Sequence, residues 1–200
     1  FLEGTLIAAK LVDAEKCYLY IRDEYYGLIK LIETEIKKLI KNKIIPDNFL
    51  EIRRGAGAYI CGEESALIES IEGKRGLPRN RPPYVAEVGL FGKPTLVHNV
   101  ETVYWIREIF EKGGQWFSSF GKNGRKGLRT FSVSGFVKSP GIKLTDAGIT
   151  INELIEEHCR KVLNDYPSTE TITPICCKGC GKLLRYSSTV NDKAYYGKDK

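Results

Sequence analysis

The sequence has no methionine, only two histidines and no long apolar run. A membrane-spanning helix needs about 20 consecutive apolar residues, so we expect no direct insertion into a membrane. No basic region precedes the apolar stretch after Phe1, which argues against a secretory signal peptide. We therefore expect a cytoplasmic protein whose six cysteines are reduced rather than joined in a disulfide framework. The missing initiator methionine indicates that the start belongs to a longer protein.

The charge balance is only mildly positive, with a net charge of +6 over 200 residues. Such an excess suits anionic ligands such as nucleotides but does not demand nucleic acid, and we expect no nucleic-acid partner. Hydrophobic residues make up 42% of the chain, which is ordinary for a soluble globular protein and sufficient for a sizeable core.

Apolar residues in the first 112 positions follow two periods, one typical of helices and one typical of buried strands. The chain order is helix, strand, helix, strand, which favours an α/β layer built on a βαβ crossover. The predicted helices cover 2–13, 24–42, 65–72 and 99–112, and the predicted strands cover 16–21 and 49–53.

A glycine-rich and basic stretch over 121–127 marks a linker. After it, an alternating strand pattern over 129–137 and a short helical pattern over 151–158 suggest a small β-grasp-like module. Beyond Arg160 the pattern decays. The sequence therefore predicts a first domain over 1–122, an incomplete second domain over 128–162 and a disordered tail over 163–200.

One glycine-rich segment, Gly55-Ala56-Gly57-Ala58-Tyr59-Ile60-Cys61-Gly62-Glu63-Glu64, follows a predicted strand and opens a predicted helix. Gly55 and Gly57 lack Cβ atoms, which lets a ligand approach the backbone closely, and the N–H groups that open the helix favour an anion. Two alternatives remain open from the residues alone. The glycines could form only a tight turn, and Glu63 and Glu64 could serve only the helix dipole.

The loop over 73–94 is rich in glycine and proline and carries four basic residues. A loop of this length inside a domain is usually functional or disordered. Its basic residues could form a solvated face or a patch that faces phosphate, and the sequence favours neither. These residues are Lys74, Arg75, Arg79 and Arg81.

The stretch from Gly55 to Gly73 resembles, almost residue for residue, the flavoprotein subunit of respiratory complex I, the 51 kDa family, and its soluble relatives. The resemblance continues through Arg81-Pro82-Pro83-Tyr84, through Gly89-Leu90-Phe91-Gly92-Lys93-Pro94-Thr95 and through Asn99-Val100-Glu101-Thr102. It covers roughly residues 1–160. It implies an α/β FMN-binding domain of the complex I 51 kDa type, followed by the start of a β-grasp (soluble-ligand-binding) domain.

Within that family, two segments are closer to the β subunit of NAD-dependent formate dehydrogenases. One is Leu96-Val97-His98-Asn99-Val100-Glu101-Thr102, in which His98 stands where complex I subunits usually have asparagine. The other runs from Gly124 to Gly135. We therefore rank formate dehydrogenase above complex I, with a hydrogenase diaphorase third.

The resemblance implies two cofactors, FMN and NAD, with hydride passing between NADH and the flavin. It implies a catalytic role for Glu64, whose carboxylate would accept hydrogen bonds from the ribose or carboxamide of NADH. Tyr84 would stack on the adenine. No resident metal is expected in this chain. The implied cofactor-binding residues are Gly55, Gly57, Tyr59, Gly62, Glu63, Glu64, Tyr84, His98, Asn99 and Thr102.

The family has parts that this sequence lacks. A glycine-rich phosphate loop is expected before Phe1, and the cysteines that hold a [4Fe–4S] cluster are expected far beyond residue 200. The implied partners are a thioredoxin-like 2Fe–2S subunit and a catalytic subunit of a multi-subunit dehydrogenase. Two alternatives remain, namely a noncatalytic remnant that binds no cofactor and a zinc-binding fragment built on Cys176, Cys177 and Cys180.

Overall fold

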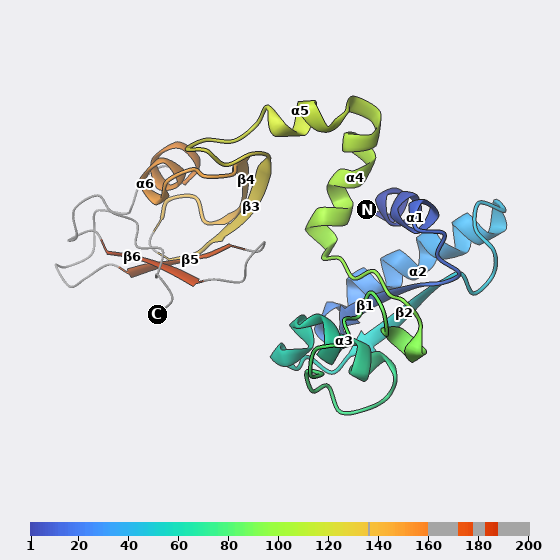
Figure 1. The fold of residues 1–200 in the computed structure, drawn as a ribbon. Coiled ribbons are helices and arrows are strands. Elements are labelled where there is room, and N and C mark those ends of the chain that lie inside the picture. Colours follow the sequence, from blue (N-terminus) through green and yellow to red (C-terminus); the bar gives the residue numbers. More distant parts are fainter. Residues whose placement is uncertain (136, 160–171, 178–182, 188–200) are drawn as a thin grey trace. The chain divides into compact units, whose positions relative to one another are not determined.

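The structure, a computed structural model, describes residues 1–135, 137–159, 172–177 and 183–187 (Figure 1). The chain divides into two units, Phe1–Arg107 and Glu108–Lys200, which are described separately. The division predicted from sequence, with domains over 1–122 and 128–162, stays a prediction. No helix in the described residues is long and apolar enough to cross a membrane.

The first unit is built on two parallel strands, β1 (Cys17–Arg22) and β2 (Leu50–Gly55), which pair in register from Cys17 opposite Leu50 to Arg22 opposite Gly55. A short 3-10 turn, η1 (Asp23–Tyr25), and helix α2 (Tyr26–Lys41) connect them. This is the predicted βαβ crossover, preceded by helix α1 (Leu2–Leu11).

Helix α2 covers the strand pair with an isoleucine face (Figure 1). Its buried residues Ile29, Ile32 and Ile36 recur at helical spacing, and two of them join a core cluster with Leu19 of β1 and Leu50 of β2. The lysines of the helix occupy its exposed side. The amphipathic pattern thus positions the crossover, because only this face can bury apolar area against the strands.

A 3-10 turn, η2 (Tyr59–Gly62), and helix α3 (Glu64–Ile71) follow β2. The long loop after α3 contains the turn η3 (Leu90–Gly92) and returns to the same helix, so that Val85 and Leu90 share a buried cluster with Ile68 and Ile71. Helix α4 (Val100–Lys112) then crosses the boundary between the two units.

The second unit contains helix α5 (Gly114–Ser118) and an antiparallel sheet in the order β4-β3-β5-β6. Its strands are β3 (Leu128–Val133), β4 (Gly141–Asp146), β5 (Ile172–Cys177) and β6 (Leu183–Ser187). The last two strands correct the disordered tail that we expected over 163–200; the rest of that tail lies outside the described residues. β5 pairs with β3 on one side and with β6 on the other, and the pairing with β3 joins segments about 40 residues apart that no local pattern connects.

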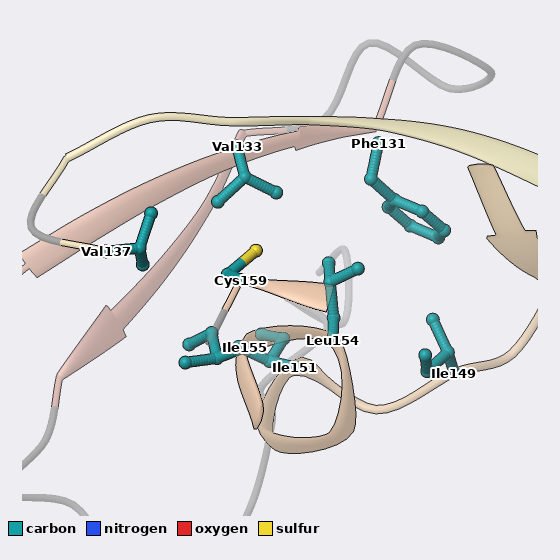
Figure 2. Packing of buried hydrophobic residues seen from close by; sticks show 8 residues of the cluster. All are labelled: Phe131, Val133, Val137, Ile149, Ile151, Leu154, Ile155 and Cys159. Atoms are coloured by element: carbon teal, nitrogen blue, oxygen red, sulfur yellow. The ribbon is translucent and has the colours of Figure 1, made fainter. Parts of the chain in front are cut away.

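The core of the second unit lies between β3 and a short helical segment, which consists of α6 (Ile151–Glu153) and the π-helical turn η4 (Leu154–His158). Figure 2 shows Phe131 and Val133 of β3 facing Cys159 and Leu154, with Ile151 and Ile155 of the helical segment below them. Thr150 and Glu153 form a capping box that fixes the start of this segment. The β-grasp assignment of this unit stays a prediction.

Candidate cofactor site

The candidate site lies where the two parallel strands end together. Because Arg22 pairs with Gly55, the segments that follow, 23–25 and 56–62, leave the sheet at the same edge. An ion pair between Arg54 and Asp23, with 2.5 Å between Arg54 Nη2 and Asp23 Oδ1, joins the two strand ends. In open parallel sheets, ligands bind at the carboxyl ends of the strands. The glycine segment therefore occupies the edge where an α/β protein builds its binding site.

The three glycines of this turn differ in what a side chain would meet at each position. At Gly55, a Cβ atom would lie 2.6 Å from Cε1 of Tyr20, so this glycine makes room for a protein side chain and not for a ligand. Gly57 has a φ of +84°, which an L side chain rarely adopts. At Gly62, a Cβ atom would meet no atom within 4 Å. Only Gly62 therefore borders space that a ligand can fill.

The backbone of the turn also presents donors. Among the described residues, the N–H groups of Gly57, Ala58 and Tyr59 donate to no hydrogen bond, whereas the N–H of Cys61 is bonded to the carbonyl of Ala58 at 3.2 Å. Tyr59 is 90% exposed, and the neighbouring Ile60 is exposed as well. Free N–H groups beside an exposed aromatic and an aliphatic side chain match a flat ligand with polar edges, so the donor set fits FMN.

Glu63 is the N-cap residue of α3. Its Oε2 atom accepts from the N–H groups of Ser65 at 3.0 Å and Ala66 at 2.9 Å, and from the Ser65 hydroxyl at 2.5 Å. Burial raises the pKa of this carboxyl, but these bonds, together with the charge of Arg81, outweigh burial, and the pKa is lowered overall. Glu63 therefore holds the helix start, as the helix-dipole alternative predicted for both glutamates.

Glu64 is bound differently from its neighbour. Its Oε1 atom lies 2.7 Å from Nη2 of Arg81, and the same guanidinium nitrogen lies 2.6 Å from Oε1 of Glu63. Glu64 makes no capping bond. Within the ranges that the structure describes, the only partner of its carboxylate is the half-exposed Arg81 of a neighbouring loop, so Glu64 is the member of the pair that a ligand can engage.

The basic loop residues are mostly paired with carboxylates of α3 and its C-cap. Lys74 lies 2.7 Å from Glu72, and Arg79 bonds both Glu69 and Glu72. Arg81 completes the set through Glu63 and Glu64. Three of the four cations are thus paired with carboxylates of the first unit, and Lys74 and Arg81 stay exposed, so the solvated face and the patch that faces phosphate both stay predictions.

The other predicted site residues lie elsewhere on the first unit. Asn99 caps α4 by accepting from the N–H of Thr102 at 2.8 Å, and both residues are exposed, as are His98 and Tyr84. Within the described part of the chain, no hydrogen bond or ion pair joins them to the Gly55–Glu64 turn. The structure therefore brings together the turn and Arg81, and separately Asn99 and Thr102.

Sequence reasoning missed two residues of this site. Glu24 follows β1, and its carboxylate Oε1 lies 3.3 Å from the position that a Cβ atom would take at Gly57. Arg81 is one of four basic loop residues and begins a segment that resembles the family, but the sequence assigned it no role in the site. The signal for Glu24 was present, because an acidic pair directly follows a buried strand next to the crossover helix.

Metal chemistry has no support in the described residues, which hold no group of three or more His, Cys, Asp or Glu side chains placed for an ion. The side chains of Cys176, Cys177 and Cys180, on which the zinc alternative rests, lie outside the described part of the chain.

Comparison with known proteins identifies the family. Residues 1–108, just over half of the chain, match the family described as Complex1_51K, the Nuo51 FMN-binding domain. The chain belongs to this family. The membership confirms the α/β FMN-binding fold that the resemblance implied, and the family's cofactors are FMN and NAD.

Two curated relatives illustrate the membership. The mitochondrial NADH dehydrogenase [ubiquinone] flavoprotein 1 of Dictyostelium discoideum is 41% identical over 181 residues, and a subunit of the NADH-quinone oxidoreductase of Rickettsia bellii is 39% identical over 181 residues. Both matches cover 86% of this chain, which is 172 of its 200 residues, so the similarity extends past the limit near residue 160 that we expected. The chain spans 38% and 43% of the length of these relatives.

Solved structures of an NAD⁺-reducing [NiFe]-hydrogenase are also similar. The air-oxidized state matches with a TM-score of 0.75 and 32% identity over 94% of this chain and 35% of the hydrogenase chain. The H₂-reduced state matches with a TM-score of 0.73 and 39% identity over 80% of this chain and 28% of that chain. The family is therefore one of oxidoreductase subunits that work with NAD(H).

Proposed function

We propose that this chain binds FMN at the 56–62 turn and NADH beside Glu64, and that it serves hydride transfer between the two in a flavoprotein subunit of a multi-subunit dehydrogenase. The observation that carries the proposal is the turn itself, which combines unpaired N–H groups with open space at Gly62 at the carboxyl edge of a parallel strand pair. FMN, when bound, supplies the chemistry that takes up a hydride and releases single electrons to iron–sulfur partners.

The chain's own residues would bind and orient the two ligands. The N–H groups of Gly57 and Ala58 would donate to polar atoms of FMN, and Tyr59 would cover an apolar face. Glu64 would exchange Arg81 for a donor on NADH, such as a ribose hydroxyl or the carboxamide. In this role Glu64 fixes the nicotinamide end of the dinucleotide for hydride transfer.

Three further residues complete the proposed binding surface. Tyr84 is half exposed and offers an aromatic face to the adenine. Asn99 and Thr102 lie exposed at the start of α4, where an amide and a hydroxyl suit phosphate oxygens, and His98 precedes them.

Titration of FMN into the purified chain tests the proposal directly, with bound flavin measured by quenching of its fluorescence. Gly62→Ala fills space that no protein atom occupies, so it should weaken FMN binding about tenfold. Gly27→Ala is the matched control, because a Cβ atom at Gly27 also meets nothing within 4 Å but lies on α2. A wild-type chain without measurable FMN affinity would overturn the proposal and leave the noncatalytic alternative.

We also propose that the parent enzyme is of the formate dehydrogenase type, with complex I and a hydrogenase diaphorase as the alternatives. Support comes from His98 and from the segment between Gly124 and Gly135, while the named relatives are NADH dehydrogenase subunits and hydrogenases. The test is capture of the native complex that contains this chain, followed by assay of NAD⁺ reduction with formate and with hydrogen, and of quinone reduction with NADH. Activity with hydrogen or quinone alone would refute the formate assignment.

A further inference from the structure

Arg79 ties the loop that carries Arg81 to helix α3. Its Nε atom donates to Oε1 of Glu69 at 2.5 Å, and its Nη2 atom donates to Oε1 of Glu72 at 3.2 Å. The remaining nitrogen, Nη1, donates to the backbone carbonyls of Val88 at 3.3 Å and Gly89 at 3.1 Å. All three guanidinium nitrogens are thus in use, and the side chain joins the helix to the far end of the loop.

The backbone of Arg79 makes a second connection, to the start of the same helix. Its N–H donates to the hydroxyl oxygen of Ser65 at 2.8 Å, and that hydroxyl donates to Glu63. Ser65 is 1% exposed, so bulk water does not compete for this hydroxyl. One buried group therefore couples the cap of α3 to the loop.

The far end of the loop is fixed through Glu72. Its Oε1 atom also accepts from the N–H of Phe91 at 2.7 Å, and Phe91 has a φ of +52°, which is uncommon for a bulky residue. The segment between Arg79 and Phe91 is thus attached to α3 and its C-cap at both ends. Arg81 lies two positions after the first attachment, and Tyr84 lies between the two attachments.

We infer that Arg79 is a positioning residue for the nicotinamide dinucleotide: it sets the distance between Arg81 and Glu64 and holds Tyr84 where a nucleotide can reach it. This inference rests on the proposed function. Because Arg79 does not belong to the 56–62 turn, its substitution should weaken the binding of NADH and leave the binding of FMN unchanged. A lysine cannot replace it, because a single ammonium group cannot reach two carboxylates and two carbonyls at once.

The test measures two affinities and one stability on the full chain. Arg79→Lys should raise the NADH dissociation constant about tenfold, measured by NADH fluorescence on the FMN-loaded chain, while the FMN dissociation constant stays within about twofold of wild type. The urea midpoint of unfolding should fall modestly, because the bonds to two carboxylates and two carbonyls are not all kept, and the affinities are compared in the absence of urea. Lys74→Gln is the matched control, because Lys74 pairs with the same two carboxylates but makes no described bond to the loop over 79–92. It should change none of the three quantities.

Glu69→Gln provides a second variant in case Arg79→Lys fails to fold. It keeps the size of the side chain, weakens one of the Arg79 bonds, and should shift NADH binding in the same direction by a smaller factor. An unchanged NADH dissociation constant in both variants would overturn the inference while FMN binding by wild type kept the proposed function intact. Equal losses of FMN and NADH binding would also overturn it, since they would show a purely structural role. A wild-type chain that binds neither ligand would overturn both proposals.

Discussion

Glu63 and Glu64 are adjacent and chemically identical, yet Glu63 caps helix α3 whereas Glu64 only pairs with Arg81. This difference can be measured. Glu63→Ala removes the N-cap of α3 and leaves the Ser65 hydroxyl without its acceptor. Glu64→Ala removes only a carboxylate that pairs with Arg81. We expect the first substitution to destabilise the first unit and the second to leave its stability nearly unchanged.

The magnitudes follow from the bonds lost. Replacement of an N-cap residue by alanine costs about 1 kcal/mol, and a buried hydroxyl deprived of its partner adds about 1 kcal/mol, so Glu63→Ala should cost about 2 kcal/mol. A partly exposed ion pair contributes at most about 1 kcal/mol, which bounds the loss for Glu64→Ala. The two losses need not add, because both glutamates share Arg81.

The assay is urea unfolding, monitored by tryptophan fluorescence in a Trp116→Phe background. This leaves Trp105, which is buried in the first unit, as the only tryptophan. Equal losses for the two alanine variants, or a larger loss for Glu64→Ala, would refute the division of roles. FMN-loaded protein should show the reverse order for NADH binding, with Glu64→Ala the weaker binder.

The same pair predicts a pH dependence. Because its hydrogen bonds lower the pKa of Glu63 in the folded chain, its contribution to stability is complete above the ordinary value of 4.5 and is lost as pH falls through the lowered value. The stability difference between wild type and Glu63→Ala should therefore shrink on acidification below 4.5. A difference that stayed constant through this range would show that the charge of Glu63 is irrelevant to the cap.

Four further substitutions test the packing. Leu154→Ala should cost about 3 kcal/mol in urea unfolding because this side chain is fully buried, whereas Leu144→Ala, on an exposed position, should cost less than about 0.5 kcal/mol; similar values would refute the core shown in Figure 2. Gly55→Ala should cost about 1–3 kcal/mol in thermal unfolding because its Cβ meets the ring of Tyr20, and a neutral result would show that the ring moves away. Gly27→Ala should stabilise α2 by about 0.5–1 kcal/mol, and a loss of stability would contradict the open surroundings there.

Local periodicity sufficed for much of the first unit. The isoleucines of α2 repeat at helical spacing, so the helix could be predicted, and its start differs from the prediction only because residues Asp23–Tyr25 form a 3-10 turn. The strands and α3 were placed to within two residues for the same reason. Each of these elements is defined by neighbours in the sequence, which a single chain makes visible.

Features that depend on distant partners were not predictable. A glycine is needed at position 55 because a Cβ atom there would meet the ring of Tyr20, which is 35 positions earlier in the chain. The roles of Arg79 and Arg81 depend on carboxylates of the helix that precedes them. Strand β5 was missed because it pairs with β3, about 40 residues away, and strand β6 was missed with it because β6 pairs with β5. In each case the residue type was visible in the sequence but its partner was not.

The common end point of β1 and β2 has a consequence for protein engineering. Since the ladder closes at Arg22 and Gly55, substitutions in the segments 23–25 and 56–62 leave every strand pair intact. A combinatorial library could therefore randomise the exposed positions of these segments, while Asp23, Gly57 and the buried Cys61 stay constant together with the strands and α2. Selection from such a library would sample ligand preference separately from folding, which few sites built across a protein core permit.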